Sequence, residues 1–435
     1  MANRSFILLA IVAVITGMGV AWPALYTVGL CLLVLVVALI ALDAAMLFAR
    51  GGVEALRSCA ERFSNGDDNE VQLHIHNTGW LTLHMQVIDE APVELHRRDL
   101  TFSLTLAAGA KHAINYVLRP VRRGLMAFGD IVVVASTSLG LAQRTFRCKA
   151  EQQVKVYPSF MMLNRMEILS VSNSLVEAGI KRIRRVGNNT EFEQIKDYVQ
   201  GDDYRTINWK ASARRHQLMV NVYQDERSQQ IYSLIDKGRL MQQAFHGMTL
   251  LDYAINAALV LSYVAINKDD KAGVMTYAAQ FDTFVRASRQ HGHMQTILEN
   301  LYHQQTEFGE PDYAALCKQV NHYVNRRSFV VLFTAFSGMS DLNRCLPYLK
   351  QMNNRNRLLI VFFDDVEMRQ LIDSPMEDTL DYFHHVSAER YQFERRLIVS
   401  TLRQNGIFSM LTTPDQLIVN VVNRYLEMKS RNQLT

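Results

Sequence analysis

The chain opens with two apolar stretches, and this pattern predicts a membrane anchor. Phe6 to Val20 is an uncharged apolar run, the chain turns at Trp22-Pro23, and Leu25 to Leu42 is a second run of about bilayer-spanning length. A signal peptide would have one apolar core and then a polar chain. A buried hairpin in a soluble core is the alternative, but no polar positions mark a solvent face. We therefore predict a transmembrane hairpin over residues 1–49 that contacts the lipid bilayer.

Basic residues predict the orientation of this hairpin. Arg4 precedes the first run, while Arg50, Arg57 and Arg62 follow the second, and the turn at Trp22-Pro23 carries no charge. Lys and Arg concentrate on the cytoplasmic side of membrane spans. We expect a multi-pass protein with two spans and both termini in the cytoplasm.

Residues 50–158 change to the alternating pattern of strands. The alternation predicts an antiparallel β-sandwich, immunoglobulin-like in architecture, because short strands recur between turn signals. The expected strands are Val71 to Asn77, Leu81 to Val87, Phe102 to Leu106, Tyr116 to Arg119, Ile131 to Ala135, and Val154 to Tyr157.

Residues 229–435 alternate between strand and helix patterns. Continuous apolar runs predict strands that are covered on both faces, and the whole predicts a doubly wound, mostly parallel α/β sheet. The expected strands are Gln230 to Ile235, Ala272 to Tyr277, Phe281 to Val285, Phe329 to Phe333, Leu358 to Phe363, and Ile407 to Leu411. The expected helices are Leu250 to Ile266, Met294 to Tyr302, Tyr313 to Val324, Ser387 to Gln404, and Pro414 to Lys429.

The connecting segment, residues 159–228, carries the most unusual composition. A turn at Gly201-Asp202-Asp203 is followed by Arg205, Trp209, Arg214 and Arg215. Carboxylates beside this much arginine stay ionised, which favours a salt-bridged clasp between the two flanking modules over a general base. A binding surface built from the arginines and the indole is the alternative.

This segment carries an ordered motif that resembles a known family, the bacterial proteins of "domain of unknown function 58". Asn208 stands where that family usually has aspartate. The residues that carry the resemblance are Glu191, Phe192, Tyr198, Gly201, Asp202, Asp203, Arg205, Ile207, Trp209, Ser212, Ala213, Arg214, Leu218 and Glu226.

The resemblance extends over the whole chain and implies a multidomain protein of the bacterial inner membrane. The implied α/β domain is von Willebrand factor A-like, and the implied partner is a MoxR-type AAA+ ATPase. We therefore expect a non-enzymatic, membrane-anchored adaptor that acts in assembly or maturation of a client complex. The alternatives are a metal-dependent hydrolase that uses Asp202 and Asp203, and a structural protein of the lipid surface.

A-like domains can hold a divalent cation at the end of the first strand, but the expected ligands are incomplete here. The motif D-x-S-x-S reads Asp236-Lys237-Gly238-Arg239-Leu240, and Ala335 stands where a second carboxylate is expected. One carboxylate flanked by two cations is a poor Mg²⁺ or Ca²⁺ site. We predict no metal and no cofactor, and expect Asp236 to pair with an arginine or to cap the next helix.

Composition adds exclusions. The formal net charge of +4 is spread along the chain, which argues against a nucleic-acid partner. The five cysteines are widely spaced and contain no C-x-x-C, so they fit a reducing compartment. Phosphate-binding glycine loops and hydrolase motifs are also missing from the sequence.

Overall fold

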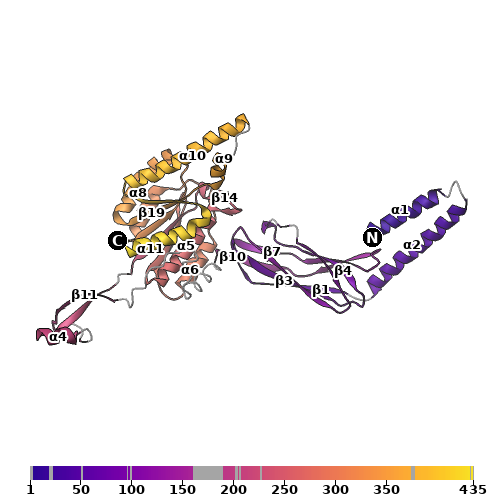
Figure 1. Ribbon diagram of the computed structural model, residues 1–435, viewed down its shortest axis with the longest axis horizontal. Coiled ribbons are helices and arrows are strands. Elements are labelled where there is room, and N and C mark those ends of the chain that lie inside the picture. The colour runs from indigo at the N-terminus through magenta and orange to yellow at the C-terminus, as the bar shows by residue number, and fades with distance from the viewer. Residues whose placement is uncertain are drawn as a thin grey trace. The chain divides into compact units, whose positions relative to one another are not determined.

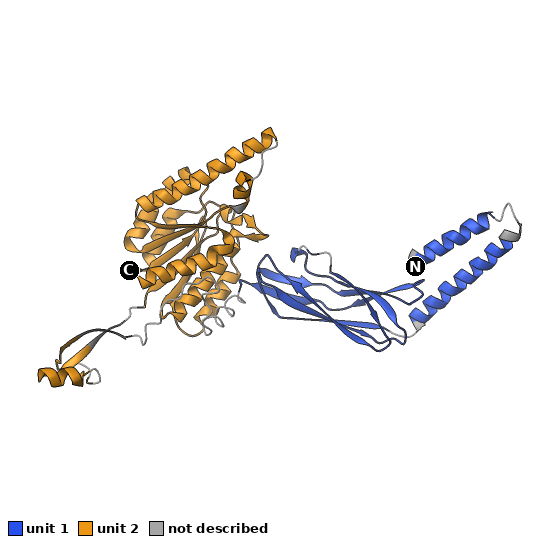
Figure 2. Ribbon diagram, in the orientation of Figure 1, with its two compact units in different colours: residues 1–161 blue, residues 162–435 orange. Residues whose placement is uncertain are grey.

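The computed structural model describes residues 3–18, 23–49, 52–95, 97, 100–159, 190–200, 204, 207–225, 228–373, 378–431 and 433–434. These fall into two compact units, residues 1–161 and residues 162–435 (Figure 2). Each unit is described by itself below.

Both N-terminal apolar runs are helical. Helix α1 covers Asn3–Met18 and helix α2 covers Pro23–Ala49 (Figure 1). Their large apolar side chains are mostly exposed, as expected of surfaces that face lipid rather than a protein core. Residues Tyr26–Phe48 are long and apolar enough to cross a membrane, whereas Arg4–Met18 is apolar but shorter. Leu250–Asn267 passes the same test but is mostly buried, so it is a core helix.

The rest of the first unit consists of short strands in three sheets, with the orders β1-β3-β6, β2-β10-β7 and β5-β4-β8-β9. Their bounds are β1 Val53–Cys59, β2 Arg62–Ser64, β3 Asn69–Asn77, β4 Leu83–Asp89, β5 Thr101–Leu106, β6 Lys111–Leu118, β7 Gly124–Phe128, β8 Ile131–Ser136, β9 Gln143–Cys148 and β10 Gln152–Tyr157. A short 3-10 turn, η1, covers Val93–Leu95.

The predicted strands of this unit are confirmed, and β1, β2, β7 and β9 are additional. One apolar core takes its side chains from β1 and β3 on one sheet and from β4 and β8 on another, so these two sheets pack face to face. Their alternating burial explains the alternating sequence. The prediction of purely antiparallel pairing is wrong at one place, because β10 pairs with β2 in parallel.

The second unit contains a six-stranded sheet of order β17-β16-β13-β18-β19-β20. Its strands are β13 Gln230–Asp236, β16 Lys271–Tyr277, β17 Phe281–Ser288, β18 Phe329–Phe333, β19 Arg357–Phe363 and β20 Phe408–Thr412. All neighbours are parallel except the edge strand β17, which pairs antiparallel with β16. The predicted mixed α/β domain is thus confirmed.

Helices cover both faces of this sheet (Figure 1). One face packs against α5 Leu250–Asn267, α6 His293–Tyr302 and α11 Leu417–Ser430. The other packs against α7 Tyr313–Tyr323, α8 Met339–Arg355 and α10 Thr379–Gln404. Shorter elements are η4 Arg239–Gln242, β14 Ala244–Phe245, β15 Met248–Thr249, α9 Val366–Asp373 and η5 Pro414–Gln416. Helices α8 and α9 were not predicted, and α10 begins before the predicted Ser387.

The described residues that precede the sheet in the second unit form a β-hairpin. Strand β11 Thr190–Asp197 pairs antiparallel with β12 Met219–Asp225, and the short helix α4 Trp209–Arg215 lies between them in the chain. The side chain of Asn208 caps α4 by accepting a hydrogen bond of 3.0 Å from the backbone N–H of Ala211. Thus the segment that sequence alone left as a connection contains a folded element.

Candidate functional site

The strand order places a natural ligand position at the centre of the sheet. After β13 the chain builds outward on one side through β16 and β17, and then crosses to β18 on the other side. In open α/β sheets ligands bind outside the carboxyl ends of the strands, at the point where the order reverses. Asp236 ends β13, and Thr334 follows β18 directly.

Asp236 is enclosed at this edge, with 1% of its surface exposed. Its Oδ1 accepts a hydrogen bond of 2.7 Å from the backbone N–H of Gly238, and its Oδ2 accepts one of 2.7 Å from the hydroxyl of Thr334. Because the Thr334 hydroxyl has one proton, the hydroxyl of Tyr313, 2.7 Å away, donates to Thr334. The result is a directed chain of hydrogen bonds from Tyr313 through Thr334 to Asp236.

This cluster is strongly desolvated. Burial raises the pKa of Asp236 to about 6, the nearby carboxylate of Asp341 adds to the rise, and the hydrogen bonds from Thr334 and Gly238 oppose it. Burial also raises the pKa of the Tyr313 phenol well above its ordinary value, so that side chain stays neutral. Asp236 is thus an enclosed carboxyl that changes charge near neutral pH.

The expected cations do not neutralise Asp236. Lys237 points elsewhere: its Nζ lies 2.9 Å from Oδ2 of Asp282 and 3.0 Å from Oε1 of Glu307. Burial lowers the pKa of Lys237, but these two hydrogen bonds outweigh it and raise the pKa. Asp236 was predicted to pair with an arginine or to cap the next helix. Its Oδ1 accepts a hydrogen bond from the backbone N–H of Gly238, but no side chain caps the 3-10 turn η4 that follows Gly238, so capping is not confirmed. Among the described residues, no arginine pairs with Asp236.

The residues around Asp236 offer few ligands to a metal ion. Both of its oxygens already accept hydrogen bonds, and Ala335 follows Thr334 without adding a carboxylate. Among the described residues, no group of three or more His, Cys, Asp or Glu side chains is placed to hold a metal. Metal binding in the whole chain stays a matter of prediction.

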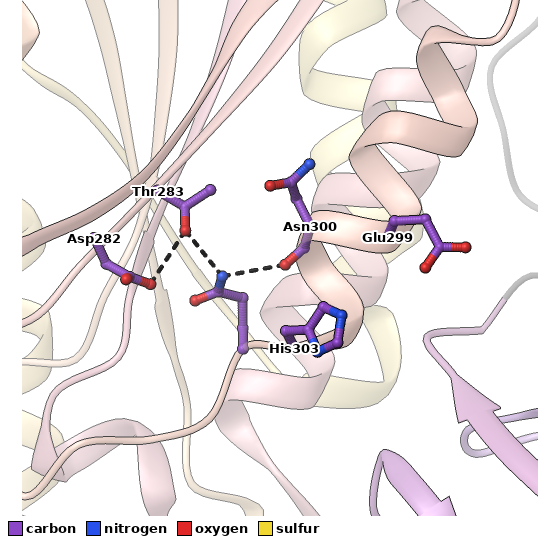
Figure 3. Close-up of a pocket in the computed structure, with 6 residues that line it drawn as sticks. Asp282, Thr283, Glu299, Asn300 and His303 are labelled. Carbon is purple, nitrogen blue, oxygen red and sulfur yellow. Dashed lines mark hydrogen bonds between the residues drawn. The ribbon is translucent and has the colours of Figure 1, made fainter.

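A polar pocket that the sequence did not indicate lies beside the edge strand β17. It has a volume of about 370 Å³ and is lined by Asp282, Thr283, Glu299, Asn300, His303 and Gln304 (Figure 3). The Nε2 of Gln304 donates to the Thr283 hydroxyl and to the backbone carbonyl of Asn300, both at 3.1 Å. These residues come from β17, from α6 and from the two positions that follow α6, and they form no sequence motif. Their carboxylates, amides and imidazole can hydrogen-bond a polar ligand.

The structure gathers the described part of the family motif in the β11–β12 hairpin. Glu191 and Phe192 lie on β11 opposite β12, and the backbone N–H of Tyr198 donates to the carbonyl of Leu218 at 2.8 Å. The hydroxyl of Ser212 accepts a hydrogen bond of 2.9 Å from the backbone N–H of Met219. Gly201, Asp202, Asp203, Arg205 and Glu226 lie outside the described residues.

One aromatic and three basic side chains are exposed on α4, the helix between β11 and β12 in the chain. Trp209, the first residue of α4, has 70% of its surface exposed, and Lys210, Arg214 and Arg215 are exposed on the same helix. We call these four residues the Trp209 surface. The clasp between the two modules stays a prediction.

Asn208 has a local reason for replacing the aspartate of the family pattern. Its Oδ1 caps α4, and its Nδ2 donates a hydrogen bond of 2.8 Å to Oδ1 of Asn221 on β12. An aspartate would keep the cap but would lose this donor. The amide therefore ties α4 to the hairpin strand.

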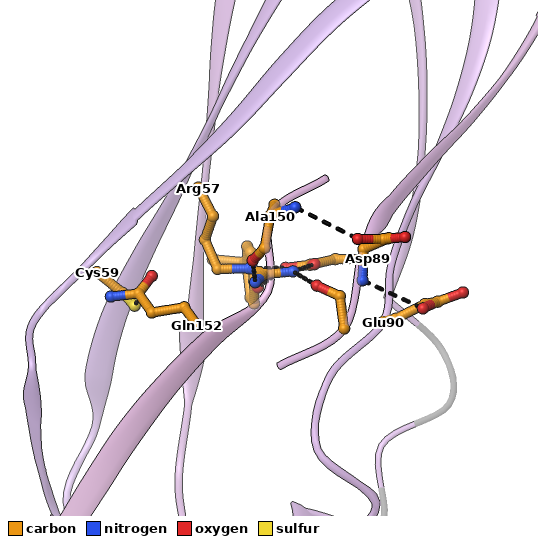
Figure 4. A network of polar contacts seen from close by, with 9 residues as sticks. Arg57, Cys59, Asp89, Glu90, Ala150 and Gln152 are labelled. Carbon is orange, nitrogen blue, oxygen red and sulfur yellow. Dashed lines mark hydrogen bonds and ion pairs between the residues drawn. The ribbon is translucent and has the colours of Figure 1, made fainter. Parts of the chain in front are cut away.

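A buried ion pair in the β-sandwich was also missed. Arg57 and Asp89 have side chains 1% and 0% exposed and pair through two guanidinium nitrogens (Figure 4). Arg57 also donates to the carbonyls of Ala150 at 2.7 Å and Gly129 at 3.1 Å, and the Tyr116 hydroxyl donates to Asp89. Arg57 is therefore a core residue whose charge is paired with that of Asp89.

Comparison with known proteins gives a family for part of the chain. Residues 194–378 match the family model described as "Protein of unknown function DUF58". "Uncharacterized protein YeaD" of Bacillus subtilis (strain 168) is 26% identical over 126 residues, which cover 28% of this chain and 31% of that protein. The chain thus spans under a third of the length of this curated relative.

Solved structures are only distantly similar. One match is the CARDB domain of the PF1109 protein from Pyrococcus furiosus, crystallised with di-metal ions. The match covers 25% of this chain and 96% of the solved chain, with 12% identity and a TM-score of 0.19. A beta-glucosidase from Listeria innocua covers 24% of this chain and 16% of its own, with 16% identity and a TM-score of 0.14. Neither likeness carries an inference about this chain. Residues 194–378, from within the hairpin to the approach to α10, form a domain of the DUF58 family.

Proposed function

We propose that this protein is a non-enzymatic, membrane-anchored adaptor whose cytoplasmic part docks a MoxR-type AAA+ ATPase during assembly or maturation of a client complex. The observation that carries the proposal is the Trp209 surface, which lies inside the DUF58 match and exposes an indole beside three cations. Tryptophan and arginine dominate the energetics of protein interfaces. An indole left in water is therefore a credible anchor for a partner.

The positive charge of this surface favours a partner whose contact surface is acidic. Lys210, Arg214 and Arg215 crowd one short helix, and no carboxylate of the described residues is paired with them. A partner surface that is acidic and has an apolar pocket for the indole would complement it. We propose that the ATPase presents such a surface.

Membrane attachment is the second part of the proposal. The exposed apolar side chains of α1 and α2 support insertion of both helices, with the turn between them outside the cytoplasm. Helix α1 has 16 residues, fewer than a straight span usually needs, so local thinning of the bilayer or the flanking residues would complete it.

The A-like identity of the α/β unit is the third part. A six-stranded sheet with helices on both faces and an antiparallel edge strand β17 supports it. In this reading Asp236 retains the position of a cation ligand but accepts hydrogen bonds from Gly238 and Thr334 instead. The carboxyl edge of the sheet would then contribute shape, rather than a metal, to partner binding.

Co-purification from a detergent extract tests the adaptor role. The intact chain should bring down a MoxR-type ATPase, and Trp209→Ala should lose it while keeping its membrane fraction and its melting temperature. Trp80→Ala is the matched control, because Trp80 is 56% exposed but lies on the β-sandwich. Recovery of the ATPase at equal levels with both variants would refute the assignment of the Trp209 surface. A chain that captures no ATPase would refute the partner.

A further inference from the structure

A second cavity lies at the carboxyl edge of the α/β sheet, beside the point where the strand order reverses. It has a volume of about 30 Å³, and about 10–15 Å³ of such space is enough for one water molecule, so it has room for about two. Ala335 after β18, Phe363 at the end of β19 and Leu250 at the start of α5 form its apolar wall. Arg395 of α10 also lines it.

Arg395 is the unusual member of this wall. It is 7% exposed, and its Nη2 donates a hydrogen bond of 2.6 Å to the hydroxyl of Tyr391, over whose ring the guanidinium lies at 4.5 Å. Its Nη1 is buried and has no hydrogen-bond partner among the described residues, and none of their carboxylates pairs with it. A buried cation without an anion is costly, so the site lacks an acceptor.

Two of the three acidic residues that line this pocket, Asp364 and Asp365, are already engaged elsewhere, and the third, Glu367, is exposed. Asp364 pairs with Arg369. The Oδ2 of Asp365 accepts a hydrogen bond of 3.0 Å from Nε2 of Gln243, and its Oδ1 accepts one of 3.0 Å from the backbone N–H of Glu367. These carboxylates therefore leave Arg395 uncompensated and repel a highly charged anion such as phosphate.

We propose that Arg395 and this pocket bind a single carboxylate group. A carboxylate is planar and matches the fork of the guanidinium, so it fits the small volume, and its single negative charge is repelled less than phosphate by the acidic residues nearby. The guanidinium turns about its terminal bonds to receive it, and Tyr391 keeps the ring face under the cation. The group comes from an aspartate or glutamate side chain of a protein or from a small free acid. This inference does not depend on the adaptor role.

Acetate, which reproduces the aspartate side chain, is the probe. The full chain in detergent should melt about 3 °C or more higher in acetate, at about ten times its dissociation constant, than in chloride of equal ionic strength and pH. Arg395→Gln should abolish this increment. Arg396→Gln is the matched control, because Arg396 is the exposed neighbour on α10, and it should keep the increment.

Two further arms complete the test. If Arg395→Gln fails to fold, Arg395→Lys keeps the charge but loses the fork, and it should show a smaller acetate increment than the parent. A short peptide with one central aspartate, compared with its asparagine counterpart, identifies the source: stabilisation by the aspartate peptide points to a protein side chain, and stabilisation by acetate alone points to a free acid. Equal melting in acetate and chloride, or an equal increment in the parent and both Arg395 variants, would overturn the proposal.

Discussion

At the scale of single residues, the most informative groups are charges that the fold encloses. Asp236 at the end of β13 and the Arg57–Asp89 pair in the sandwich are nearly free of solvent contact, but they differ in compensation. Asp236 has only neutral hydrogen-bond donors, whereas Asp89 has a guanidinium. The stability that depends on Asp236 should therefore change with pH. The stability that depends on the Arg57–Asp89 pair should fall when one partner is removed.

Asp236 predicts a loss of stability as pH rises. Its pKa is about 6 in the folded chain, above the value near 3.9 of an unfolded aspartate, so the folded state holds the proton more tightly. This contribution is fully present below about pH 4 and is lost as pH rises through about 6, on the order of 3 kcal/mol in total. The melting temperature should fall more between about pH 4.5 and 7 in the parent than in Asp236→Asn. Parallel curves for the two would contradict the assignment.

The Arg57–Asp89 pair predicts a large cost for a single substitution. Asp89→Asn leaves the buried guanidinium of Arg57 without its anion, which should cost about 3–5 kcal/mol of unfolding free energy. Replacing both residues, as Arg57→Met with Asp89→Leu, should cost less than the sum of the single changes. Arg147→Gln is the control, because its 3.9 Å contact with Glu90 is on the surface and should contribute at most about 1 kcal/mol. Denaturant unfolding measures the cost of Asp89→Asn, of Arg57→Met and Asp89→Leu singly and together, and of Arg147→Gln; additive costs of the two single changes would contradict the coupling.

At the scale of elements, helix α2 is continuous with the sandwich rather than a free anchor. Asp43 near its end is buried and accepts hydrogen bonds from the backbone N–H groups of Leu141 at 3.0 Å and Ala142 at 2.8 Å, and from the hydroxyl of Thr137. Leu47, one turn on, belongs to the sandwich core. The last turns of α2 therefore belong to the folded domain.

Asp43→Ala should loosen this attachment. It leaves the amides of Leu141 and Ala142 without their acceptor, at a cost of about 1–3 kcal/mol. Hydrogen exchange should become faster at these two amides, while Val133 and Ala135 inside β8 keep their protection. Unchanged exchange at Leu141 and Ala142 would show that Asp43 does not hold the helix.

The elements that the sequence predicted are those with a regular pattern of hydrophobic residues over a few consecutive positions. The apolar runs of β13, β18 and β19 and the alternation of β3 identify themselves, because each is covered in a uniform way. Helix α8 was missed because it is largely polar and contains Pro347. Site geometry was harder: Lys237 follows Asp236 in the sequence, but its partners Asp282 and Glu307 lie 45 and 70 residues further along the chain. No short sequence pattern indicates contacts between residues so far apart in the chain.

At the scale of the whole molecule, an apolar helical pair begins a chain whose second unit carries the DUF58 match. The orientation of the pair determines the compartment of everything that follows. Because Arg57 is buried in an ion pair, the argument from basic residues rests on Arg4 and on Arg50 and Arg62 after α2. The topology stays a prediction, with a smaller charge difference behind it.

A reporter fused after Thr435 tests this topology. We expect green fluorescent protein to fluoresce there and alkaline phosphatase to be inactive, because an even number of spans returns the chain to the cytoplasm. A phosphatase fusion in the turn between α1 and α2 should be active. An active phosphatase after Thr435 would reverse the orientation and would rule out a cytoplasmic partner.

The affinity of the intact protein for a purified MoxR-type ATPase tests the central claim most directly. The measurement uses the full chain in lipid nanodiscs and compares the parent with Trp209→Ala and Trp80→Ala. An indole that anchors an interface contributes about 2 kcal/mol or more, so Trp209→Ala should weaken binding by about thirtyfold or more, while Trp80→Ala should bind like the parent. Equal affinities for all three proteins, or no binding by the parent, would contradict the account.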